Sequence, residues 1–128
     1  MKSVSALSFG RVFNAIGYSV KGLCAAFRDE AAFRQELGLF TVLAGVTVWL
    51  HLSLERTVLL LALMGLVLAI ELLNSGLEAL VDKTSPEMHP LAGKAKDCGS
   101  AAVFLSMLSF LGAWGALAGP ALWTRVFG

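Results

Sequence analysis

The residues best suited to chemistry lie along one otherwise apolar segment. Their side chains are carboxylates, an amide and a hydroxyl: Glu71, Asn74, Ser75, Glu78 and Asp82. A helix turns about 100° per residue, so all five fall within one sector about 100° wide. The preceding residues, 57–70, are apolar throughout, as in a membrane helix. Carboxylates on such a helix are costly unless their face meets protein, water or a metal ion, so the stripe predicts a functional site.

The two glutamates of the stripe are expected at different depths. Glu78 falls near the headgroups if roughly 20 residues from Thr57 fill the hydrocarbon. Glu71 then lies about 10 Å deeper, at 1.5 Å per residue. A shallow carboxylate can hold a metal ion and its phosphates near water. A deeper, buried one can take a proton from the hydroxyl of a lipid. The structural alternative is a hydrogen-bond network that joins helices.

The composition is that of a membrane protein. The chain has 128 residues, of which 57% are hydrophobic and 15% are charged, against roughly 45–50% and 25% in soluble domains. We expect one domain, 1–128. The net charge of +1 argues against a nucleic-acid-binding protein, which would typically be strongly basic. The two cysteines provide neither a disulfide framework nor zinc-ligand spacing.

Hydrophobic periodicity predicts an all-α membrane protein. An amphipathic, basic helix over 7–28 is typical of a helix on an anionic membrane surface. A polar hinge, 29–36, separates it from the first span. Each span approaches the roughly 20 residues needed to cross the hydrocarbon, and Pro120 is expected to end or bend the last. The predicted transmembrane helices are 37–54, 57–81 and 99–123.

Basic residues predict the orientation of the chain in the membrane. Five precede the first span, and the 82–97 loop carries Lys83, Lys94 and Lys96. The turn between the first two spans has only Arg56, and the C-terminal tail only Arg125. The positive-inside rule therefore places the N-terminus and the 82–97 loop in the cytoplasm, and the C-terminus outside. The stripe then ends on the cytoplasmic side, where nucleotides are.

The cytoplasmic loop has a second polar group, Lys94, Lys96 and Asp97. It reads equally well as a positive flank or as a phosphate clamp. The sequence has no Walker loop, no G-x-G-x-x-G, no nucleophile elbow and no H-E-x-x-H motif. The residues alone leave an enzyme, a carrier and an assembly factor open.

Several segments together resemble the integral-membrane diacylglycerol kinase family of Gram-negative bacteria. The resemblance runs from Arg11 to the third span, and the Glu-x-x-Asn-Ser-x-x-Glu-x-x-x-Asp pattern of the stripe is its most specific part. The other matching segments are Ala15-Ile16-Gly17-Tyr18-Ser19, Lys21-Gly22-Leu23, Glu30-Ala31-Ala32-Phe33-Arg34-Gln35-Glu36, Ala95-Lys96-Asp97 and Gly99-Ser100-Ala101-Ala102.

The resemblance implies a homotrimer in the inner membrane, with sites shared between subunits. Such an enzyme transfers the γ-phosphate of MgATP to diacylglycerol and gives phosphatidic acid. Glu71 resembles the general base, and Glu30 and Glu78 resemble the Mg²⁺ ligands. The residues that resemble nucleotide contacts are Arg11, Tyr18, Glu30, Glu78, Glu87, His89, Lys96 and Asp97. Those that resemble lipid-side or site-shaping residues are Ala15, Ser19, Ala32, Gln35, Glu36, Glu71, Asn74 and Ser100.

The chain departs from the family pattern at Val20, Cys24 and Met88, outside the carboxylate set. Val20 and Cys24 leave the surface helix more apolar, and Met88 puts a side-chain role at that turn in doubt. One rival is an undecaprenol kinase of the same superfamily, although the 30–36 segment favours the diacylglycerol branch. The other rivals are a non-catalytic oligomeric membrane scaffold and a small ion carrier.

Overall fold

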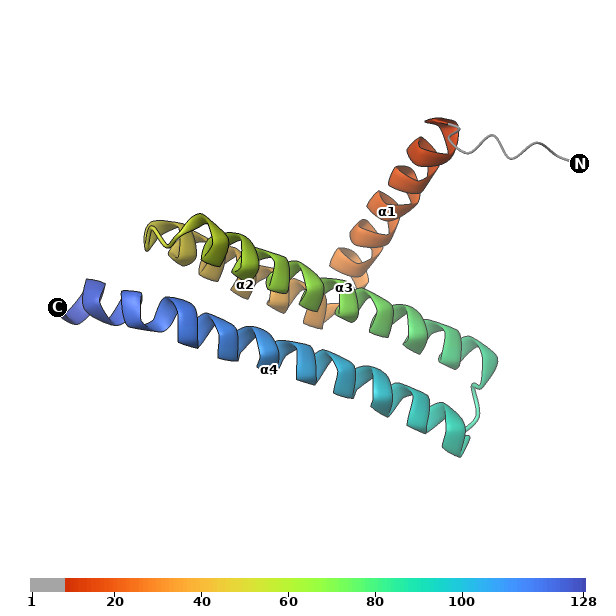
Figure 1. Ribbon diagram of the computed structural model, residues 1–128. Helices are drawn as coiled ribbons and strands as arrows, with labels where there is room; N and C mark the ends of the chain where they lie inside the picture. The colour runs from red at the N-terminus through yellow and green to blue at the C-terminus, as the bar shows by residue number, and fades with distance from the viewer. Residues whose placement is uncertain (1–8) are drawn as a thin grey trace, which may run out of the picture.

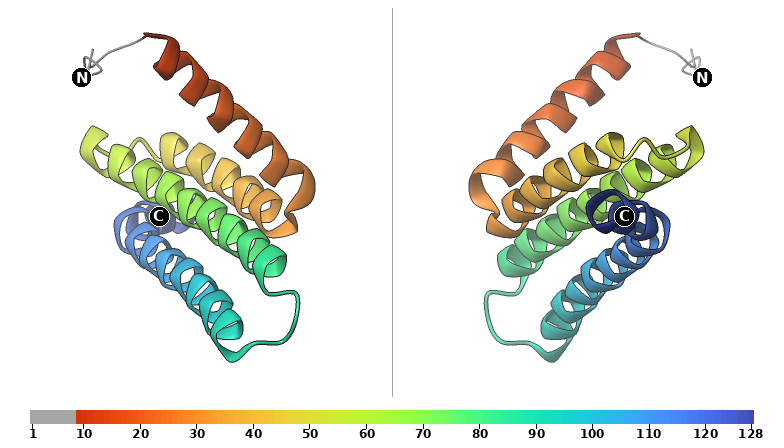
Figure 2. Two further views of the ribbon diagram at one scale, coloured as in Figure 1. Left: turned by 90° about the vertical axis from the view of Figure 1, so that its right-hand side faces the viewer. Right: turned by 90° about the vertical axis from the view of Figure 1, so that its left-hand side faces the viewer.

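The computed structural model describes residues 9–128, which form four helices. Their bounds are α1 Phe9–Asp29, α2 Ala31–Trp49, α3 Leu54–Thr84 and α4 Pro90–Phe127. Helices α2, α3 and α4 run side by side, whereas α1 projects from this bundle at a steep angle (Figures 1 and 2). The most extensive contact is between α3 and α4. Leu7 and Ser8 of the predicted surface helix lie outside the described residues.

Helix α1 leaves its apolar side uncovered. Phe9 and Phe13 are 81% and 71% exposed, and Ile16 and Phe27 are also exposed. Only Ala26, near its C-terminal end, is buried against the rest of the chain. An apolar helix face with no protein partner suits a helix that lies in a membrane interface.

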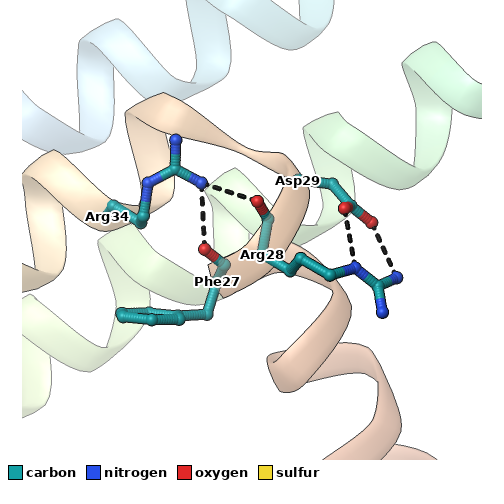
Figure 3. Close-up of polar contacts among 4 residues, drawn as sticks. All are labelled: Phe27, Arg28, Asp29 and Arg34. Carbon is teal, nitrogen blue, oxygen red and sulfur yellow. Dashed lines mark hydrogen bonds and ion pairs between the residues drawn. The ribbon is translucent and has the colours of Figure 1, made fainter.

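The junction between α1 and α2 is much shorter than the predicted hinge over 29–36. Glu30 is the only non-helical residue there, with φ −106° and ψ 112°. The Arg34 guanidinium donates to the carbonyls of Phe27 and Arg28 at 3.0 and 2.8 Å (Figure 3). Helix ends leave carbonyls without helical partners. The side chain that was expected in a hinge therefore caps the end of α1.

A bidentate ion pair also lies at this junction. Arg28 donates from Nε and Nη2 to the Asp29 carboxylate at 2.8 and 3.0 Å (Figure 3). These hydrogen bonds hold the pKa of Asp29 below its usual value. Both side chains are exposed, so the pair contributes little to stability.

The remaining helix bounds differ from the predicted spans. Helix α2 ends at Trp49 and not at Leu54, because His51 takes a left-handed conformation with φ 52°. Ser53 then caps α3 by accepting from Arg56 N. Helix α4 begins at Pro90, well before the predicted span at 99, and passes through Pro120 to Phe127. Of the two expectations for Pro120, that it ends the helix is therefore wrong, and that it bends the helix stays a prediction.

Two small apolar clusters hold α2, α3 and α4 together. In the first, Phe40 and Phe110 meet edge to face with ring centroids 4.9 Å apart, beside Met64 and Val67. The second contains Leu50, Leu60 and Ala118. Between the clusters, Trp114 Nε1 donates to Thr47 Oγ1 at 3.0 Å, and Thr47 is fully buried.

Within residues 9–128, α3 and α4 are the helices long and apolar enough to cross a membrane. Helix α2 does not meet the same criterion. Its first turns carry Arg34, Gln35 and Glu36, and it ends at Trp49, so its apolar part is short. The structure thus supports a membrane protein with two clear spans, whereas the sequence predicted three.

Candidate active site

The polar stripe on α3 passes gradually from protein interior to solvent. Glu71 is 5% exposed and adjoins the cluster that contains Val67. Asn74, Ser75 and Glu78 are half-buried, and Asp82 is exposed. Along the stripe, Glu71 is therefore the side chain most enclosed by protein, and Asp82 is the most exposed.

Asn74 and Glu78 are joined by a hydrogen bond one turn apart on α3. Asn74 Nδ2 donates to Glu78 Oε1 at 3.2 Å. Asn74 Oδ1 is buried and has no hydrogen-bond partner among the described residues. The amide thus presents its nitrogen to the carboxylate, while its oxygen is held away from water.

Acidic side chains from three parts of the chain gather around Glu71. Glu71 lies within electrostatic range of Glu30, Glu78 and Glu36. Glu36 Oε2 is buried and without a hydrogen-bond partner among residues 9–128. Like charges that interact in this way disfavour full ionisation of all the carboxylates together unless a positive charge is near.

The donor set fits Mg²⁺. Mg²⁺ prefers oxygen ligands and is usually held by one or two carboxylates together with substrate phosphates. Glu30 and Glu78 can supply such carboxylates. No group of three or more His, Cys, Asp or Glu side chains in the described part of the chain could enclose a metal ion by itself.

A cavity of about 530 Å³ lies between α1 and α3, next to this acidic cluster. Ser19 and Glu30 line it from the α1 side, and Leu72, Ser75 and Gly76 line it from α3. Its wall is mainly apolar with a few polar groups. A cavity of this kind suits a molecule with an apolar body and a small polar head.

A second cavity, of about 500 Å³, lies at the turn between α3 and α4. Glu87 and His89 of that turn line it, together with Asp82 and Lys96 from the two helices. Lys96 Nζ and the Asp82 carboxylate form an ion pair at 2.5 Å. The cavity is therefore lined by acidic and basic side chains, and Lys96 among them is of a type that binds phosphate.

Asp82, the last residue of the stripe, pairs with Lys96 across the α3–α4 turn. Ser75, also on the stripe, lines the α1–α3 cavity.

Other predicted site residues are not brought to either cavity. Arg11 and Tyr18 lie on α1, which projects from the bundle (Figure 1). Ser19 donates back to the Ala15 carbonyl at 3.0 Å. The predicted residues that are exposed and line neither cavity are Arg11, Ala15, Tyr18, Ala32, Gln35, Asp97 and Ser100.

Comparison with known proteins gives one consistent family. A family profile described as prokaryotic diacylglycerol kinase matches residues 17–118. A diacylglycerol kinase of Pseudomonas aeruginosa is 48% identical over 104 residues, which cover 81% of this chain and 85% of the relative.

More distant relatives agree. A diacylglycerol kinase of Escherichia coli K12 is 47% identical over 83% of this chain and 87% of its own length. One of Helicobacter pylori J99 is 38% identical over 86% of each chain. Together with the acidic stripe on a membrane-type helix, these matches confirm the resemblance found in the sequence: the chain belongs to the prokaryotic diacylglycerol kinase family.

Proposed function

We propose that this protein transfers the γ-phosphate of ATP to the free hydroxyl of diacylglycerol and so forms phosphatidic acid. The observation that carries the proposal is Glu71, a buried carboxylate on a membrane-type helix, one turn before Ser75, which lines the α1–α3 cavity. A lipid alcohol in that cavity would bring its polar head towards the acidic cluster. The family membership supports the same reaction.

In this proposal Glu71 takes the proton from the lipid hydroxyl as the oxygen attacks the γ-phosphorus. The bond from the γ-phosphorus to the bridging oxygen of ATP breaks, and ADP leaves with that electron pair. Catalysis in phosphoryl transfer comes mainly from positioning and charge stabilisation. Glu71 needs to lie close to the lipid hydroxyl. Because it is buried, water has little access to its carboxylate and competes little with the lipid as a proton donor.

Glu30 and Glu78 would hold Mg²⁺, with Asn74 supporting Glu78 through the hydrogen bond between them. When bound, Mg²⁺ neutralises charge on the phosphate oxygens of ATP. Lys96, Glu87 and His89 would contact the nucleotide from the α3–α4 cavity. The two cavities would thus receive the two substrates on either side of the carboxylates.

The proposal extends to the assembly and its membrane. We place the chain in the bacterial inner membrane with α2 as a further span, the N-terminus cytoplasmic and the C-terminus periplasmic. Three copies would form a homotrimer with shared sites. Arg11, Tyr18, Asp97 and Ser100, which line neither cavity of one chain, would meet substrates in that assembly or on substrate binding.

The experiment is direct phosphorylation of lipid by purified protein. Protein in mixed micelles is given γ-labelled ATP, Mg²⁺ and either diacylglycerol, undecaprenol or no lipid. Label in phosphatidic acid, at least tenfold above the undecaprenol product, is the expected result. Preferred labelling of undecaprenol would identify the sister enzyme. No ATP consumption with either lipid would indicate a scaffold or a carrier, and nucleotide-independent ion flux in sealed vesicles would identify the carrier.

A further inference from the structure

Gly99 on α4 lies directly against the Asn74 side chain of α3. A Cβ atom at Gly99 would overlap Asn74 Oδ1 and would lie 3.2 Å from Asn74 Cγ. It would also lie 3.2 Å from Leu77 Cδ2. At Gly112 and Gly115, on the same helix, an added Cβ would meet nothing within 4 Å. The overlap is therefore specific to the point where α4 passes Asn74.

Glycine inside a helix carries a cost in helix stability, because its backbone loses the most freedom on folding. At Gly99 the absence of a side chain allows α4 to lie against the Asn74 amide. The amide is confined from two directions, since Nδ2 donates to Glu78 Oε1 at 3.2 Å and Oδ1 lies buried against α4. The orientation with Nδ2 towards Glu78 and Oδ1 towards Gly99 satisfies both constraints.

We propose that Gly99 is a positioning residue for the site: it holds the Asn74 amide in the orientation that directs the Glu78 carboxylate. The inference about orientation stands on packing alone, while its effect on catalysis depends on the role proposed for Glu78. A methyl group at position 99 would displace the end of the Asn74 side chain. That end is flexible, so the protein would adapt by rotating the amide and losing its bond to Glu78, with the helices still folded.

The direct test observes the Asn74 side chain without substrate or metal. The sequence contains two asparagines, Asn14 and Asn74, so ¹⁵N-asparagine labelling gives two side-chain NH₂ signals. The Asn74→Ala variant assigns them by loss of one. In Gly99→Ala the Asn74 signal should shift or broaden while the Asn14 signal stays. In the matched control, Gly112→Ala, both signals should stay, and an unchanged Asn74 signal in Gly99→Ala would overturn the proposal.

Kinetics test the consequence. In Gly99→Ala we expect the Mg²⁺ concentration for half-maximal activity to rise at least fivefold. KM for diacylglycerol should stay within twofold, and Gly112→Ala should resemble the parent. If Gly99 acts through Asn74, adding Gly99→Ala to Asn74→Ala should change this Mg²⁺ requirement less than twofold. Additive effects would show that Gly99 does not act through Asn74, and rescue of Gly99→Ala by Leu77→Ala would show that packing against Leu77 is responsible; either result would overturn the proposal.

Two further outcomes are distinguishable. If the parent phosphorylates no lipid, the proposed function fails, but the Asn74 signal still tests the role of Gly99. If Gly99→Ala does not fold, the double variant with Asn74→Ala removes the overlap and should recover folding. A double variant that also fails to fold would contradict the proposal.

Discussion

At the residue scale, Glu71 and Glu78 lie on one helix in different surroundings, which suit the two different roles that we propose for them. Glu71 is enclosed by protein, whereas Glu78 is half-buried and bonded to Asn74. Identical side chains in different surroundings can serve as proton acceptor and as metal ligand. Each task can be removed by replacing one carboxylate with an amide of the same shape.

We expect Glu71→Gln to lower kcat by at least about 100-fold, the usual contribution of a general base. Binding of MgATP should change little, because Glu71 is assigned to the lipid hydroxyl. Phosphatidic acid formation in mixed micelles measures the first effect, and binding of a non-hydrolysable ATP analogue measures the second. The exposed Glu55→Gln, in the first turn of α3, serves as control. Full activity in Glu71→Gln would remove Glu71 from the mechanism.

Glu30→Gln and Glu78→Gln should each raise the Mg²⁺ concentration for half-maximal activity, by about tenfold. Removing one of two carboxylates weakens the hold on a cation that prefers anionic oxygen ligands. Activity measured against total Mg²⁺ at fixed ATP gives the value. If neither variant changes this dependence, the metal ligands lie elsewhere.

At the element scale, single polar contacts join helices that are otherwise apolar. Trp114 Nε1 on α4 donates to Thr47 Oγ1 on α2, and the Thr47 hydroxyl donates in turn to the Leu43 carbonyl. Away from water, such a bond fixes the relative position of two helices that share only apolar contacts. It adds one specific contact between α2 and α4 to the more extensive packing of α4 on α3.

Trp114→Phe should destabilise the fold by about 1 kcal/mol, the usual net contribution of one such hydrogen bond. Unfolding in mixed micelles by an increasing fraction of dodecyl sulfate measures the change. Trp123→Phe is the matched control, because Trp123 is 67% exposed and near the end of the same helix. Equal stability of the two variants would mean that the Thr47 contact contributes nothing measurable.

The elements themselves were mostly predictable, and their junctions were not. The stripe on α3 follows from helical period, so Glu71, Asn74 and Glu78 could be grouped from sequence. The 29–36 hinge was wrong because charge density resembles a loop, whereas Arg34 uses its charge to cap α1. The Asp82–Lys96 pair and the approach of Gly99 to Asn74 depend on how α3 and α4 pack, which no local pattern specifies.

At the scale of the whole molecule, the surface is unusually apolar for a protein in water. Exposed leucines recur every seventh residue along α3, and further apolar side chains face outwards from α4. The row on α3 consists of Leu59, Leu66, Leu73 and Leu80. Patches of this extent mark surfaces that meet lipid or other protein. They accord with α3 and α4 as membrane spans.

The orientation of α4 can be tested with cysteines on either side of it, at Thr84, which ends α3, and at Gly128, which follows α4. In a Cys24→Ser/Cys98→Ser background, Thr84→Cys should be protected from a membrane-impermeant maleimide in cells with an intact inner membrane. Gly128→Cys should react once the outer membrane is permeabilised. Both should react after lysis. Labelling of the two positions on the same side would contradict a single crossing by α4.

The one-residue link at Glu30 has a mechanical consequence. Since α1 and α2 are continuous up to this residue, any change in the tilt of α1 must pass through the φ and ψ torsions of Glu30. The same torsions aim its carboxylate. If Glu30 binds Mg²⁺ as proposed, holding its carboxylate on the ion would restrain the tilt of α1, and a change in that tilt would move the carboxylate.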